Sequence, residues 1–151
     1  MKIKGILLLT TLLIMVSCAS DNETCREETR VVLRVGFFST VNSALASVDS
    51  VTVVGIPNGT IFYNNSKSIN KVELPLQASG TATEFAIRFN EQWDTLTVLH
   101  TTNPYFVSYA CGMIYTHQID TVLIRGSVSK SLKIEAKLVN NQNVQHLQIY
   151  R

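Results

Sequence analysis

The sequence predicts an all-β protein: a single sandwich of two antiparallel sheets, arranged as in immunoglobulin-like or transthyretin-like domains. Two observations carry this prediction. Apolar and polar side chains alternate with a period of two in several segments, which is typical of strands with one face in a core and one in water. Turn-forming Asn, Pro, Gly and Ser residues separate these segments at near-regular intervals, as they do in sandwich domains of this length.

The alternation is clearest around Leu33 to Phe37, around Phe85 to Phe89, and in residues 132–138, which read LKIEAKL. Polar or turn-forming stretches at residues 57–59, 64–70, 79–80, 103–104 and 140–143 bound the remaining segments. Further strands are therefore predicted at residues 50–56, 60–63, 71–76, 95–101, 105–111, 113–119, 122–126 and 145–150.

One segment has a different period. Val41, Ala44, Leu45 and Val48 are spaced as on one face of a helix, and Ser39 or Thr40 could cap its start. Its Asn and Ser content is poor for a helix. A short helix near residues 40–48, or a crossover loop, is expected there.

The N-terminus has the features of an export signal. Lys2 and Lys4 precede an apolar run over residues 5–16, which is shorter than the roughly 20 residues that span a bilayer. The run ends in MVSC at residues 15–18, which resembles the lipobox of bacterial lipoproteins, with Met15 where Leu is commoner. This predicts a signal peptide over 1–17, a lipidated Cys18 with a linker over 18–29, and a sandwich over 30–151. The alternative is an ordinary signal peptide, or a short anchor, with an incidental cysteine.

The residues after Cys18 bear on location. Ala19 replaces the Asp that retains enterobacterial lipoproteins in the inner membrane, and Asp21 with Glu23 weakly resembles the surface-export signal of Bacteroidota lipoproteins. A solvated linker would look the same. We expect a lipid-anchored protein of the outer membrane, on either its periplasmic or its cell-surface face.

The three cysteines divide into one acceptor and one pair. With Cys18 lipidated, Cys25 and Cys111 remain as an even pair in an oxidising compartment, where a disulfide is expected. Closing so long a loop would stabilise the fold by about 4–5 kcal/mol in the chain-entropy treatment. The alternative, a reactive thiol beside a histidine, has no local support.

Charge and motif content exclude several functions. Lys2 and Lys4 account for the formal net charge of +2, so the rest of the chain is balanced and lacks the basic footprint of a nucleic-acid-binding protein. His100, His117 and His146 lack the short spacing of zinc ligands, and no nucleophile elbow or phosphate-binding glycine loop occurs. We expect no catalytic residues, no metal and no cofactor.

Aromatic residues are the better lead toward a ligand. Trp93 lies in a polar turn context, and Tyr105 and Tyr109 lie on or beside a strand. Exposed rings on a sandwich can hold sugar faces, which makes these three residues candidate ligand contacts. For Trp93 itself the favoured interpretation is that it folds over one end of the core with its indole N–H bonded locally.

The segment 106–112 (FVSYACG), taken with the anchor, the early Cys25 and the Asp49-Ser50-Val51 opening of a strand, resembles a set of small Bacteroidota lipoproteins. These belong to the uncharacterised family called domain of unknown function 6452. The resemblance implies an anchored all-β domain and supports Cys25 and Cys111 as partners. It implies no activity.

A second resemblance concerns modification. Ser50, Thr95 and Thr121 each lie between an Asp and an aliphatic residue, which is similar to the O-glycosylation motif of exported Bacteroidota proteins. Strands that open after an Asp turn would give the same pattern without any glycan.

The sequence thus predicts a non-enzymatic envelope lipoprotein, a binding or structural module whose partners are the membrane and an unknown envelope protein or glycan. The alternatives are a glycan-binding module, which needs Trp93 and a tyrosine on one exposed patch, and a pilus-type subunit. The pilus alternative requires residues 145–150 to form a displaceable terminal strand. The ligand, the membrane face and the oligomeric state do not follow from the sequence.

Overall fold

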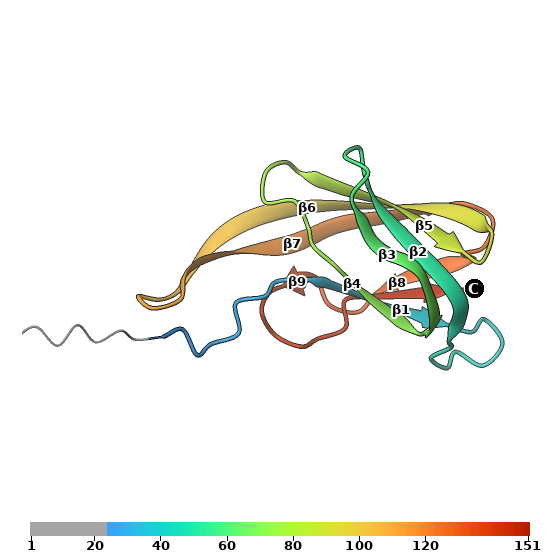
Figure 1. Cartoon of the computed structure of the whole chain (residues 1–151), viewed down its shortest axis with the longest axis horizontal. Helices are drawn as coiled ribbons and strands as arrows, with labels where there is room; N and C mark the ends of the chain where they lie inside the picture. Colours follow the sequence, from blue (N-terminus) through green and yellow to red (C-terminus); the bar gives the residue numbers. More distant parts are fainter. Residues whose placement is uncertain (1–23) are drawn as a thin grey trace, which may run out of the picture.

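The computed structural model describes residues 24–151, which form two β-sheets packed face to face (Figure 1). The predicted Cys18 lipidation site and signal peptide lie outside the described residues. The smaller sheet has the order β4-β1-β10-β8, and the larger has the order β3-β2-β5-β6-β7-β9. The ten strands are β1 (Leu33–Phe38), β2 (Val48–Ile56), β3 (Ile61–Ile69), β4 (Lys71–Leu74), β5 (Ala82–Phe89), β6 (Gln92–Ser108), β7 (Gly112–Arg125), β8 (Ser131–Ile134), β9 (Leu138–Val139) and β10 (Leu147–Tyr150).

The all-β sandwich predicted from the sequence is confirmed, with one departure in strand direction. Every strand pair is antiparallel except β1 with β10, which run parallel, with Val35 opposite Leu147 and Phe37 opposite Ile149. The last strand, β10, lies between β1 and β8, inside the smaller sheet.

The core fills the space between the sheets. The alternate residues of β1 and β5 point inward, and the Phe37 ring of the smaller sheet meets the Phe89 ring of the larger one edge to face, with centroids 5.2 Å apart. Aliphatic side chains complete the layer, and the fully buried ones include Leu33, Val35, Val53, Val72, Leu74, Ile87, Leu96, Val98, Leu147 and Ile149.

Of the two structures expected near residues 40–48, the helix is wrong and the loop is right. The segment is a turn and loop, in which Val41 is 93% exposed and Leu45 forms an isolated bridge with Phe38. Of its helically spaced residues only Val48 is buried, as the first residue of β2, so they share no buried face. The polar residues Asn42 and Ser39 accept hydrogen bonds from nearby backbone amides instead.

Three predicted turns or strands are also wrong. The polar stretch 64–70 continues the edge strand β3 as far as Ile69, and residues 103–104 lie within one long strand, β6. The regular alternation of residues 132–138 is divided between β8 and β9, which belong to different sheets. In each case the local sequence pattern was compatible with a strand, but pairing with adjacent strands decided where the strand began and ended.

Candidate functional site

Strands β6 and β7 form a hairpin that outgrows the sandwich. They pair from Thr95 opposite Arg125 to Ser108 opposite Gly112, whereas β5 accompanies β6 only as far as Leu99. On the other side, β9 pairs with β7 only at His117 and Gln118. Residues 103–116, which we call the arm, therefore have no third strand, and they curve away from the sheets (Figure 1).

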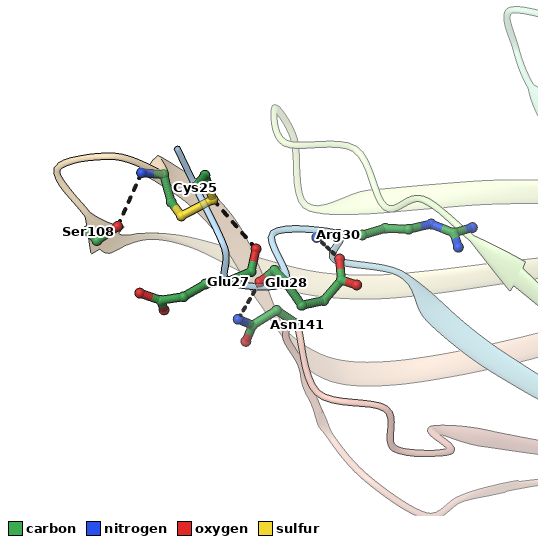
Figure 2. Close-up of a disulfide and its surroundings, with 7 residues drawn as sticks. Cys25, Glu27, Glu28, Arg30, Ser108 and Asn141 are labelled. Carbon is green, nitrogen blue, oxygen red and sulfur yellow. Dashed lines mark hydrogen bonds between the residues drawn. A yellow bond between two sulfur atoms is a disulfide. The ribbon is translucent and has the colours of Figure 1, made fainter. Parts of the chain in front are cut away.

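A disulfide ties the tip of the arm to the beginning of the described chain. Cys25 and Cys111 are bonded, with Cα atoms 4.7 Å apart and a sequence separation of 86 residues, which confirms the predicted bond. Figure 2 shows this bond beside Ser108, whose Oγ accepts a hydrogen bond of 3.1 Å from the Cys111 amide in the turn. The chain after Cys25 is thus held against the far end of the hairpin.

The same N-terminal segment is also attached to the body of the sandwich. Asn141 Nδ2 donates a hydrogen bond of 2.7 Å to the Glu28 carbonyl, and the Glu28 carboxylate accepts one from the Arg30 amide (Figure 2). The Arg30 guanidinium then pairs with Glu73 at 2.9 Å. Residues 25–30 therefore bridge the arm and the body, and do not form a free linker.

Large apolar side chains on the arm are exposed to solvent. Phe106 lies opposite Met113 and Pro104 opposite Tyr115, so these four side chains share one face of the hairpin. The ring of Tyr109, which is 98% exposed, lies 5.4 Å from that of Phe106 and extends this face into the turn. We call the exposed set the arm patch: it consists of Phe106, Tyr109, Met113 and Tyr115, each about half exposed or more.

The arm carries no formal charge. No Asp, Glu, Lys or Arg occurs between Asp94 and Asp120, a stretch that includes the whole arm. Of the residues predicted to contact a ligand, Tyr109 belongs to the arm patch and Tyr105 lies on the opposite face, beside the buried Ile114. Sequence reasoning missed Phe106 and Met113. The uncharged run around them was the available signal.

Trp93 lies far from these residues. It is twelve residues from Tyr105 on the same strand, which corresponds to about 40 Å at the rise of an extended chain. Its ring is 49% exposed and lies 5.6 Å from the guanidinium carbon of Arg88, its cross-strand neighbour. The structure therefore brings Trp93 and the arm tyrosines onto no common patch, and Trp93 does not close one end of the core.

A buried histidine pair occupies the base of the arm, which the sequence did not predict. The rings of His100 and His117 meet edge to face, with centroids 4.9 Å apart. Thr102 Oγ1 lies 2.9 Å from His117 Nδ1 and 3.3 Å from His100 Nδ1, while Thr83 Oγ1 lies 2.8 Å from His100 Nε2. Burial, followed by the charge of His100, lowers the pKa of His117 to about 4, and burial also lowers the pKa of His100.

This pair has the geometry of a structural cluster. Threonine hydroxyls already lie at hydrogen-bond distance from three of the four ring nitrogens. Within residues 24–151, no group of three or more His, Cys, Asp or Glu side chains is placed to hold a metal ion. The low pKa values favour neutral imidazoles at neutral pH.

The carboxylates of Glu84 on β5 and Asp94 on β6 point to different faces of the sheet and do not converge. Asp94 is buried and accepts a hydrogen bond of 2.7 Å from the Ser129 amide and a longer one from the Val128 amide, so it organises the chain after β7. Glu84 accepts a hydrogen bond from Thr97 on the outer face. A pocket of about 230 Å³ includes Glu84 in its lining, together with apolar residues such as Phe62 and Leu76 and polar residues such as Asn58 and Gln77.

The three hydroxyl groups of the modification motif have different environments. Ser50 is buried in β2, and its hydroxyl is hydrogen-bonded to the Asn65 side chain. Thr95 is half-buried beside the buried Asp94, and Thr121 is exposed on β7. Only Thr121 presents its hydroxyl region openly to solvent.

No helix in the described part of the chain is long and apolar enough to cross a membrane. Neither a curated protein nor a solved structure matches the chain. A family model does match, over about two thirds of the chain; its match includes the arm and Cys111 and leaves Cys25 outside. The chain therefore belongs to the family described as "Family of unknown function (DUF6452)", whose model matches residues 50–151.

Proposed function

We propose that this protein is a non-enzymatic lipoprotein of the bacterial cell envelope, anchored to the outer membrane by acyl chains on Cys18. One observation carries the proposal: Cys25 and Cys111 are consumed by a disulfide, which leaves Cys18 as the one remaining thiol of the three. That thiol directly follows Ser17 at the end of an apolar run preceded by two lysines, as the acceptor of a lipoprotein does.

The disulfide supports the same compartment. Such bonds persist in oxidising surroundings such as the periplasm and the cell surface, and they are rare in the cytoplasm. Several acyl chains hold a protein firmly to a bilayer, whereas one alone binds marginally. The resemblance to Bacteroidota lipoproteins and the Asp21–Glu23 pair favour the outer membrane and leave both its faces open.

The proposed mechanism is tethering. Acyl chains confine the sandwich to the plane of the membrane, where it binds or braces an envelope protein or glycan at raised local concentration. The described residues supply a rigid scaffold and no convergent set of catalytic or metal-binding side chains, so we propose no enzymatic step.

The two alternative functions have less support. A glycan site made by Trp93 with a tyrosine would need both on one patch, and they lie at opposite ends of β6. A pilus-type subunit would need a displaceable terminal strand, but β10 is paired on both sides, with β1 and β8. If the protein carries an O-glycan, Thr121 is the best acceptor because it is exposed, whereas Ser50 is buried.

The experiment is metabolic labelling of the full-length protein in its native host with a clickable fatty acid, followed by intact-mass measurement. We expect label and an acyl mass on the wild type, and no label on Cys18→Ala. The matched control, Cys25→Ala with Cys111→Ala, keeps its label because Cys18 is retained. Label on Cys18→Ala, or an unlabelled wild type, would refute the anchor. Mass beyond the lipidated polypeptide would report a glycan.

A further inference from the structure

We propose that the arm patch rests in the interfacial layer of the membrane to which Cys18 is anchored. The protein would then touch the bilayer twice, through its acyl chains and through Phe106, Tyr109, Met113 and Tyr115. This inference rests on the proposed acylation and adds to it a direct contact between the folded domain and lipid.

Chain length places the arm near the membrane. Cys25 follows Cys18 by seven residues, which span at most about 25 Å when fully extended. Cys25 is covalently bonded to Cys111 at the tip of the arm. The Cα atoms of Cys25 and Cys111 are 4.7 Å apart, so in any conformation of the intervening residues the tip stays within about 30 Å of the lipidated cysteine. Parts of the sandwich farther from Cys25 are held less closely.

The chemistry of the patch fits the interface between water and hydrocarbon. Tyrosine side chains favour this layer because each combines an apolar ring with a hydroxyl that stays hydrated. Phe106 and Met113 add purely apolar surface on the same face of the hairpin. All four side chains are about half exposed or more, so contact with lipid would remove apolar surface from water.

Charge and backbone limit how deep the arm can lie. Because the chain from Thr95 to Ile119 carries no Asp, Glu, Lys or Arg, the hairpin itself brings no formal charge to the lipid. Arg26 and Glu27, next to Cys25 at the tip, are exposed and can stay hydrated among the headgroups. The arm has no third strand, however, so its outer backbone groups are unpaired by protein. Such groups are costly in hydrocarbon, which restricts the arm to the headgroup layer, where water and lipid oxygens can bind them.

The anchor makes even a weak contact effective. A tether only a few residues long holds the patch at high local concentration next to the bilayer, so a small preference for lipid is enough to orient the domain. The orientation would be tip down, with the Trp93 end of β6 directed away from the membrane. Because the patch is uncharged, the contact needs no anionic lipid and depends little on salt.

The test uses the single tryptophan of the chain. Protein purified from its native host, with the modifications that it carries there, is reconstituted into phosphatidylcholine vesicles, with or without bromine on the acyl chains near the headgroup. Two proteins are compared: the wild type, which reports from Trp93, and Trp93→Phe with Tyr109→Trp, which reports from the tip. Tyr109 is 98% exposed, so its substitution leaves the fold intact, as far-UV circular dichroism would check.

We expect the tip tryptophan to shift its emission to shorter wavelength and to lose most of its intensity in brominated vesicles, while Trp93 does neither. Adding Met113→Glu to the tip reporter should restore its emission, because a carboxylate on the patch disfavours lipid. If the tip-reporter protein floats with the vesicles but its tryptophan emits as in water, the lipid contact is overturned and the acyl anchor stands. Protein that does not float at all contradicts the acylation on which both proposals rest.

Discussion

Strands β6 and β7 pass through two different environments. In the body of the sandwich, Leu96 and Val98 of β6 are fully buried against the opposite sheet, and β5 pairs with this stretch. In the arm, Phe106 and Met113 are half exposed, and the two strands pair only with each other. The body buries its large apolar side chains in a core, whereas the arm exposes its own to solvent.

The difference lies in what stabilises each part. The body gains its stability from apolar contacts between segments far apart in the sequence. A two-stranded ribbon is marginal in water by itself, and here the Cys25–Cys111 bond fixes its tip. The arm can therefore expose side chains that a body strand would have to bury. This is the physical reason to look for function there.

Breaking the body should have the largest effect. Phe37 is fully buried and packs edge to face on Phe89 across the two sheets, so Phe37→Ala removes a large side chain and leaves a cavity. We expect the free energy of unfolding to fall by about 3–5 kcal/mol in urea titrations. Tyr109→Ala is the matched control in the arm and should change it by less than about 0.5 kcal/mol. Equal losses from the two substitutions would contradict the contrast between body and arm.

Removing the disulfide that holds the arm should have an intermediate effect on stability. Cys25→Ser with Cys111→Ser opens a loop of 86 residues and should lower the free energy of unfolding by about 2–4 kcal/mol, the range typical of disulfides and below the chain-entropy value of about 4–5 kcal/mol. The arm should also lose protection in amide hydrogen exchange, while β5 and the body half of β6 keep theirs. Uniform loss of protection across both regions would show that the arm is no separate unit.

Acidification should act on the junction of the two regions, with the smallest effect. His100 and His117 lie where the arm joins the body, and above pH 6.5 both are neutral in the folded and the unfolded chain. As the pH falls below that value, the unfolded chain takes up protons, while His117 stays neutral in the fold down to about pH 4. The free energy of unfolding should therefore fall across this window, by on the order of 2 kcal/mol for His117. His117→Gln should make the dependence shallower between pH 6.5 and 4 in urea titrations at several pH values. The slope that remains comes from His100 and His146, whose pKa values burial also lowers. An unchanged slope would exclude the His117 origin.

Local pattern was enough where strands are bounded by strong signals. The alternation in Phe85 to Phe89 correctly identified the inward face of β5, and the even number of cysteines left after Cys18 identified the disulfide. The pattern failed where context overrides it. The helical spacing of Val41 to Val48 is not matched by burial, because Val41 and Leu45 are exposed and only Val48, at the start of β2, is buried. Pro104 ends no strand because it lies in the two-stranded arm, where its missing N–H breaks no ladder to a third strand.

The sequence by itself determined the sandwich class, the inward-facing residues of the main strands and the partner of Cys25, because these follow from side-chain period and cysteine count. Only the tertiary structure decided that β6 and β7 run on beyond their neighbours, that His100 meets His117, and that Trp93 lies a strand's length from Tyr105. Alternation fixes which face of a strand is buried, but not which strand lies beside it. That choice depends on contacts between distant segments, and it is what separates the exposed arm from the body.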